Sequence, residues 1–398
     1  MLTVHMLNAG EGDSIVLEYH NSSTSENSYA VIDSCYPKDK RVAPALEKLR
    51  ELGAEKLAFV CLTHPDADHY KGLHSILEEY EDKIEAFYTF PLQLYNNDTS
   101  RLKKLLNEYY NHANNGVSET IKKAAIELVA ILTHAHEKFH KKGLWEEPTG
   151  YFNQISIKAF SGVKIHCVLP SRRAKGPFLE YIDDDARAVY RNEGNNEVSV
   201  VFMLEFAGVK IILGADSTHG NWTLHKRKHS DQGGDDIASS IVKIPHHGSK
   251  IDCTNGVLDY LFSQEDDAQK IALISARGSS KHPDEEVLRS LEERGIKPYC
   301  TNVAPICTGR IKTYIDSIDL SGLEPEFQKW ISTLAVDTEP SKPCQGNVSV
   351  TIDPSGAVSV DQQIKTPCPF RGEVADIISL FKDDDKDEEV LPPKVKIN

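Results

Sequence analysis

The chain has 398 residues, 40% of them hydrophobic, and a formal net charge of −15 at pH 7. This length corresponds to one large or two modest domains with a sizeable core. The acidic balance argues against a broad basic surface for nucleic acids, although bound cations could offset it locally. The sequence has no run of about twenty apolar residues, and Met1–Leu7 lacks the basic region of a signal peptide. We therefore expect a cytoplasmic protein that does not contact a membrane.

The cysteines are spread along the chain without a Cys-x-x-Cys pair. They are Cys35, Cys61, Cys167, Cys253, Cys300, Cys307, Cys344 and Cys368. This spacing indicates free thiols in a reducing compartment, and it is not typical of a disulfide scaffold or a zinc ribbon.

The first elements alternate between strands and a helix. Thr3–Leu7 and Ile15–Tyr19 are expected strands, joined by residues 8–14, whose two glycines allow a tight turn. A third strand, Ser28–Asp33, ends on an acidic residue, and Arg41–Leu52 has helical periodicity. Such alternation predicts a layered α/β domain.

The most informative stretch follows the apolar run Leu57–Leu62. Its polar side chains are His64, Asp66, Asp68 and His69. A buried strand fixes the backbone, and the loop after it lets these side chains converge. Imidazole and carboxylate ligands suit zinc, manganese or magnesium. The plain alternative is that one aspartate caps a helix at Tyr70–Tyr80, but the two histidines would be superfluous to a cap.

Residues 97–143 depart from this alternation after a strand at Ile84–Phe90. Apolar residues recur there at helical spacing, which predicts two long helices separated near Asn114. The segment is typical of an insertion over one edge of the core, and it could contact a protein partner or a second copy of the chain. His134, His136 and His140 lie on the second helix, and the i,i+4 spacing of the last two could hold a second metal ion, but a solvated helix end is the preferred interpretation.

The middle of the chain returns to strands. Gln154–Phe160 and Val163–Leu169 are expected to form a hairpin, and Arg172–Asn196 a solvated loop. Two further strands, Glu197–Phe206 and Val209–Leu213, lead into Asp216. An aspartate at this place can bridge two cations, or it can cap a helix.

Histidines follow two later strands. His246 and His247 come after the strand Ile241–Pro245, and His282 lies between the strand Lys270–Ser275 and a helix at Asp284–Arg294. A last hairpin is expected in 347–360, and the acidic segment from 382 is expected to be disordered. Cationic side chains that could hold phosphate are Lys243, Lys250, Arg277, Lys281 and the loop run His225–His229.

These stretches together resemble the metallo-β-lactamase superfamily. Residues 64–69 resemble its His-x-His-x-Asp-His signature, with Asp66 in the second ligand position. That variant, the turn at 10–14 and the His-His-Gly-Ser element at 246–249 resemble the hydrolase domain of ComEC-type DNA-uptake channels. The resemblance covers roughly residues 1–310. It departs from the family at Cys35, where glycine is common. Like the ComEC-type domains, the chain has asparagines, Asn195 and Asn196, where the wider superfamily has a histidine ligand.

The resemblance implies a four-layer αββα sandwich over residues 1–381, with 97–143 as a helical insertion and 382–398 as an acidic tail. It also implies two divalent ions, Zn²⁺ or Mn²⁺, that share Asp216. We expect His64, Asp66 and His247 on one ion and Asp68 and His69 on the other. His247 is the better candidate of the two adjacent histidines, although the two could be exchanged.

Further roles follow from the same resemblance. The expected catalytic residues are Asp68, His246 and His282, the last contacting phosphate or protonating the leaving oxygen. Residues expected to orient the ligands from behind are Asp13, Asp33 and Asn196, and those expected to hold the substrate are Arg277 and Lys281. The implied activity is a phosphodiesterase or nuclease acting on DNA or RNA. The alternatives are a hydrolase of cyclic nucleotides or lactones and other esters, or a subunit of a multi-protein system such as phage defence.

Overall fold

In this computed structural model, the described residues are 1–10, 12–37, 42–94, 99–114, 117–150, 153–185, 194–232, 237–263, 269–276, 282–304, 306–307, 344, 346–364 and 368–371. Within these ranges, no helix has the length and apolar character that crossing a membrane requires. The expected acidic tail, 382–398, lies outside the described residues.

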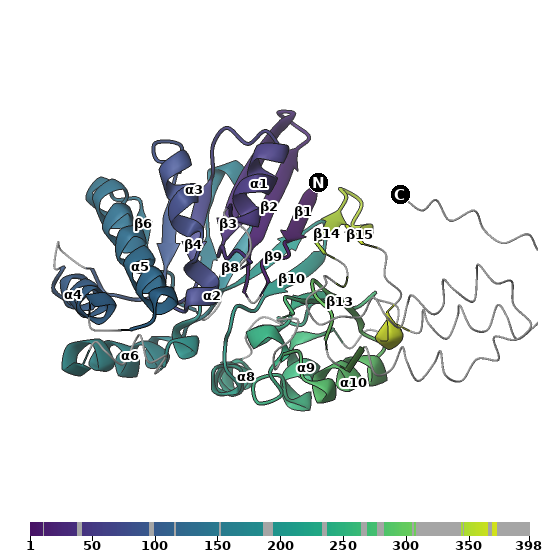
Figure 1. Cartoon of the computed structure of the whole chain (residues 1–398). Coiled ribbons are helices and arrows are strands. Elements are labelled where there is room, and N and C mark those ends of the chain that lie inside the picture. The colour runs from purple at the N-terminus through teal and green to yellow at the C-terminus, as the bar shows by residue number, and fades with distance from the viewer. Residues whose placement is uncertain are drawn as a thin grey trace, which may run out of the picture.

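The described strands form two mixed sheets (Figure 1). The first has the order β15-β14-β1-β2-β3-β4-β5-β6, and the second β13-β12-β11-β10-β9-β8-β7. The strands of the first sheet are β1 (Leu2–Met6), β2 (Ile15–Asn21), β3 (Glu26–Ile32), β4 (Phe59–Leu62), β5 (Phe87–Thr89), β6 (Trp145–Glu146), β14 (Val348–Ile352) and β15 (Val358–Gln362). Those of the second are β7 (Asn153–Ile155), β8 (Lys164–Leu169), β9 (Val201–Phe206), β10 (Val209–Leu213), β11 (Ile241–Lys243), β12 (Ile271–Ile274) and β13 (Lys297–Cys300).

Helices cover the outer face of each sheet. Those on the first sheet are α1 (Pro44–Glu51), α2 (Ala67–Tyr70), α3 (Leu73–Glu79), α4 (Ser100–Asn114) and α5 (Glu119–Lys138). Those on the second are α8 (His219–Gln232), α9 (Asn255–Leu261) and α10 (Glu285–Glu293). One buried apolar cluster lies between the sheets, and one lies between each sheet and its helices. This is the expected αββα sandwich, including its two added helices.

β4 shows why the central strands read as continuous apolar runs. Successive side chains of a strand point to opposite faces. Phe59 and Cys61 therefore pack between the two sheets, whereas Val60 and Leu62 pack against the helices. A strand that is buried on both faces has no polar positions until it ends. The polar residues of the motif accordingly begin directly after Leu62.

Parallel pairing brings several strand ends to one rim. In the first sheet β3 and β4 run parallel, with Ile32 opposite Cys61. In the second, β10, β11 and β12 run parallel, with Leu213, Lys243 and Leu273 in register. The segments that follow these strands therefore meet where the two sheets face each other.

Two segments differ from the sequence prediction. Residues 172–185 of the expected loop Arg172–Asn196 form helix α6 (Arg172–Asp185), which buries Phe178 and Ile182. Gly176 and Pro177 obscured this helix, because both residues are poor helix formers. The run 225–229 also lies on a helix, α8, and not in a loop.

Several element boundaries also differ. The strand expected at Gln154–Phe160 ends at Ile155, and Lys158–Phe160 form a 3₁₀ turn. The helix expected at Tyr70–Tyr80 is divided into α2 and α3 by Gly72, whose φ is +95°. The strand expected from Glu197 begins at Val201, because residues 196–198 form a 3₁₀ turn.

Candidate metal centre

The loop between β4 and α2 is held by the carboxylate of Asp33. Asp33 Oδ1 accepts a hydrogen bond from the Thr63 amide at 2.8 Å, and Oδ2 accepts one from Thr63 Oγ1 at 2.7 Å. The same Oδ2 lies 2.7 Å from His69 Nδ1. Asp33 thus fixes the imidazole of His69 with Nε2 directed away from it, as expected for a residue that orients a ligand.

The facing wall is built from two turns of the second sheet. Asp216 follows β10 and His247 follows β11, and both side chains are buried. Three non-glycine residues here have left-handed backbone conformations: Ala215 (φ 44°), His246 (φ 44°) and His247 (φ 54°). Such conformations cost of order 1–3 kcal/mol each, and in folded proteins they cluster at functional sites.

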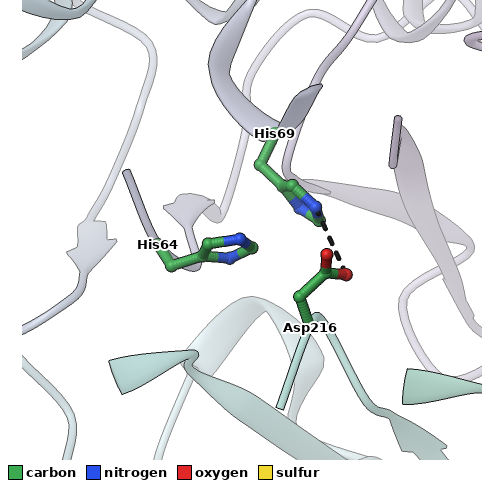
Figure 2. A group of neighbouring side chains, drawn as sticks. All are labelled: His64, His69 and Asp216. Carbon is green, nitrogen blue, oxygen red and sulfur yellow. Dashed lines mark ion pairs between the residues drawn. The ribbon is translucent and has the colours of Figure 1, made fainter. Parts of the chain in front are cut away.

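The two walls meet at Asp216. Asp216 Oδ1 lies 3.3 Å from His69 Nε2, and Oδ2 lies 3.3 Å from His247 Nε2. Figure 2 shows the imidazoles of His64 and His69 beside this carboxylate, with a dashed line for the ion pair between His69 and Asp216. The possible ligand atoms of His64, His69 and Asp216 all lie within 4.8 Å of one another, and so do those of Asp68, His69 and His247.

The donor atoms of this cluster suit a divalent cation. Nε2 of His64, His69 and His247 and Oδ1 of Asp216 are buried and have no hydrogen-bond partner among the described residues. A buried polar atom without a partner costs about 1–3 kcal/mol. Imidazole nitrogen and carboxylate oxygen are ordinary ligands of zinc and manganese. A bound cation would satisfy all four atoms at once.

The protonation of the metal-free cluster reflects its crowded charges. Burial, together with the charge of Asp68, raises the pKa of Asp66 to about 7. Burial by itself would lower the pKa of His247, but the carboxylates of Asp216, Asp68 and Asp13 together outweigh it and raise this pKa to about 9. Burial, aided by His69, holds the pKa of His64 well below its usual value.

The observed grouping differs from the expected division of ligands between two ions. His247 was expected beside His64 and Asp66, but its Nε2 lies 3.5 Å from Asp68 Oδ2. His64 Nε2 and Asp66 Oδ2 do remain neighbours, at 3.7 Å. The difference arises because His247 enters from the second sheet, on the side of the cluster where Asp68 lies.

Asp13 and Lys243 form a buried ion pair behind the cluster. Asp13 also accepts a hydrogen bond from Ser275 Oγ, and its Oδ1 lies 3.6 Å from His247 Nδ1. Lys243 was expected among the cations that hold a phosphate. That expectation is wrong, because the side chain is fully buried and paired. Gly12 is needed beside Asp13, since a Cβ there would collide with the carbonyl of Asp68.

The asparagine in contact with an expected ligand is not the predicted one. Asn195 Nδ2 donates to Asp66 Oδ1, whereas Asn196 Nδ2 lies 3.5 Å from His246 Nε2. Both residues lie at the turn that precedes β9, so their side chains diverge. Asn196 therefore adjoins an expected catalytic residue and not Asp66.

Two histidine–aspartate pairs lie at the rim of the centre. His246 Nδ1 is 2.6 Å from Asp252 Oδ2, and His282 Nδ1 is 3.2 Å from Asp284 Oδ2. The two imidazole centroids are 5.6 Å apart. Both histidine side chains are partly exposed, in contrast to His247.

Sequence reasoning named both histidines but neither aspartate of these pairs. The sequence signal that could have indicated these pairs is an acidic residue within six positions after each histidine. The expected substrate-binding residues Arg277 and Lys281 lie outside the described residues.

No protein-family model matches the chain, and no curated protein matches it. Three solved structures are similar in part. A point mutant of the CmlA β-hydroxylase has a TM-score of 0.37 and 11% sequence identity to this chain. The match covers 75% of this chain and 52% of the CmlA chain, so this chain spans about half the length of that protein. Zn²⁺-bound PqqB from Methylobacterium extorquens has a TM-score of 0.37 and 10% identity, covering 75% and 98%. A protein of unknown function from Enterococcus faecalis V583 has a TM-score of 0.29 and 8% identity, covering 85% and 86%.

Proposed function

We propose that this protein is a metal-dependent hydrolase that cleaves phosphodiester bonds, as its resemblance to ComEC-type domains implies. The observation that supports this most is the convergence of three buried Nε2 atoms on Asp216, directly beside two histidine–aspartate pairs. The first group suits two divalent cations, and the second suits proton transfer. Hydrolysis of a phosphodiester requires both an activated water and a protonated leaving oxygen.

The cluster would hold the ions through His64, His69, His247, Asp66, Asp68 and Asp216. When bound, the cations would lower the pKa of a water from 15.7 towards about 7 and stabilise charge on the phosphoryl oxygens. The Asp68 side chain is 18% exposed, so it can orient the attacking water from the open side. Asp33 keeps His69 Nε2 available by occupying Nδ1.

The rim pairs would supply the proton to the leaving oxygen. Asp252 accepts from Nδ1 of His246, which leaves Nε2 to exchange protons with the substrate. His282 Nδ1 lies within ion-pair distance of Asp284, at 3.2 Å, and its ring lies beside that of His246. Protonation matters most for an alkoxide leaving group, because alkoxides are strong bases.

A compact substrate such as a cyclic dinucleotide is the second candidate. The net charge of −15 opposes long nucleic acids. Lys243 is withdrawn into the core, and Lys250 is paired with Glu286 at 2.9 Å. Both lysine side chains are therefore less available to bind a phosphate backbone than the sequence indicated.

The test is a panel of single-stranded DNA, RNA, a cyclic dinucleotide and a lactone, each assayed with Mn²⁺ and with Zn²⁺. We expect hydrolysis of a phosphodiester, and a loss of roughly 100-fold or more in Asp68→Asn and in Asp216→Asn. Asp361→Asn, on exposed β15, is the matched control and should keep full activity. Full activity in Asp68→Asn, or hydrolysis of the lactone alone, would overturn the proposal.

A further inference from the structure

Four cysteines that are distant in sequence gather at one end of the second sheet. Cys300 is the last residue of β13, Cys307 follows it, Cys344 precedes β14, and Cys368 lies directly before a 3₁₀ turn at Pro369–Arg371. All four are buried, and they belong to the same apolar cluster between the second sheet and its helices. None of them belongs to the histidine–aspartate centre.

Backbone contacts hold the segments that carry these cysteines together. The Gly346 amide donates to the carbonyl of Thr301, the residue after Cys300, at 3.2 Å. The Cys307 amide donates to the Ala304 carbonyl at 2.9 Å. The segment that follows Cys344 is therefore hydrogen-bonded to the segment that follows Cys300.

Arg371 attaches the fourth segment. Its amide donates to the Cys368 carbonyl at 3.1 Å, and its Nη1 donates to the Pro298 carbonyl at 3.1 Å. The guanidinium carbon also lies 4.4 Å from the centroid of the Tyr299 ring. The turn after Cys368 is thus fixed against β13, the strand that ends in Cys300.

The thiols are close enough to influence one another electrostatically. Burial raises the pKa of Cys300 well above its usual value, and the thiols of Cys307, Cys344 and Cys368 raise it further. Four buried thiols in one apolar cluster cannot become thiolates together unless a cation compensates their charge. Zn²⁺ does this, and it binds four cysteines in a tetrahedral arrangement.

We propose that Cys300, Cys307, Cys344 and Cys368 bind one Zn²⁺ ion as a structural site, separate from the hydrolytic centre. The thiols would lose their protons to solvent as the ion binds. In a tetrahedral site with Zn–S bonds of about 2.3 Å, the sulfur atoms are about 3.8 Å apart.

Among the described residues, the sets with ligand atoms already within 4.8 Å of one another are histidine–aspartate sets. Zinc must therefore draw the four thiols inward. The movement falls mainly on Cys344 and Cys368, which lie outside the helices and strands, whereas Cys307 lies in a helical segment.

The site would connect the two sheets. Cys300 ends an edge strand of the second sheet, and Cys344 lies just before β14, which pairs with β1 in the first sheet. A metal ion held by both would fasten the C-terminal hairpin β14–β15 to the sandwich. This role does not depend on which substrate the hydrolytic centre accepts.

Cobalt substitution of the wild-type protein gives the first test. Tetrahedral Co²⁺ bound by thiolates has an intense sulfur-to-cobalt charge-transfer band, which histidine and aspartate ligands do not produce. We expect this band in the full-length protein, and we expect Asp68→Asn to retain it. Its absence from the wild-type protein would overturn the proposal without any cysteine variant.

Cysteine variants give the second test, with zinc measured by elemental analysis. Cys300→Ser and Cys344→Ser should each lose the band and about one zinc ion per chain. Cys35→Ser, beside the hydrolytic centre, and Cys167→Ser, between the sheets, are the matched controls and should keep both. Unchanged zinc content in the first pair, or loss of the band in Cys35→Ser, would contradict the assignment. A loss of phosphodiesterase activity with an unchanged band and unchanged zinc content would concern the hydrolytic centre and not the cysteine site.

Discussion

Lys243 Nζ donates a hydrogen bond of 2.8 Å to the carbonyl oxygen of Ala215, the residue directly before Asp216. The same carbonyl accepts from the His246 amide at 2.9 Å. Ala215 has a left-handed backbone with φ of 44°, which an alanine adopts only at an energetic cost. The buried ammonium thus holds the turn that directs Asp216 towards His69 and His247.

Lys243→Met should destabilise the protein and reduce its metal content. Removal of the ammonium leaves the buried carboxylate of Asp13 without the cation that it pairs with, which costs about 3–5 kcal/mol. Urea denaturation of the metal-free protein measures this loss. Lys250→Met, at an exposed position, should change stability by no more than about 0.5 kcal/mol. Equal midpoints for the two variants would show that the buried pair is not needed.

Asp33→Asn should weaken metal binding without unfolding the protein. The side-chain amide of the new asparagine can still accept a hydrogen bond from Thr63, but it no longer fixes the proton on His69 Nδ1. Loss of such an orienting partner lowers metal affinity about 10–100-fold. Competition with a chromophoric chelator measures the affinity. The idea fails if Asp33→Asn binds the metal as tightly as Asp361→Asn.

Metal affinity should increase as the pH rises through about 7. In the metal-free protein the pKa of Asp66 is raised to about 7 and that of His247 to about 9, and both groups must lose a proton to become ligands. At lower pH protons compete with the metal, so binding should release protons to the buffer. Calorimetry in two buffers of different ionisation enthalpy detects this release. An affinity that stays constant between about pH 6 and about pH 8 would show that neither group is a ligand.

His246→Ala should reduce hydrolysis most for substrates with a poor leaving group. If His246 protonates the leaving oxygen, its loss costs roughly 10²–10⁴-fold with an alkoxide leaving group. A nitrophenyl phosphodiester, whose leaving group needs no proton, should lose far less. Asp252→Asn should follow the same pattern more weakly, since Asp252 acts through His246. Equal losses on both substrates would assign these residues to binding.

The strand-end residues could be predicted from sequence because their signals are local. An apolar run that stops at Leu62 and continues with histidines and carboxylates specifies both the strand and the place of the candidate ligands. The same holds for Asp216 after β10 and for His247 after β11. The two added helices also followed from periodicity, although a partner for their exposed Tyr110 and Ile121 stays a prediction.

The remaining features depend on contacts between distant segments. Whether Asn195 or Asn196 meets Asp66 depends on the rotation of one 3₁₀ turn, which composition does not reveal. The burial of Lys243 depends on Asp13, from the other sheet. The four cysteines appeared scattered for the same reason, because the fold and not their spacing brings them together.

The central claim is that side chains from both sheets bind divalent cations at one rim. Anomalous diffraction from crystals of the full-length protein, loaded with Zn²⁺ or Mn²⁺, tests it most directly. We predict two peaks, with Asp216 between them and with Nε2 of His64, His69 and His247 among the ligands. Crystals of loaded protein with no anomalous peak beside Asp216 would contradict the account.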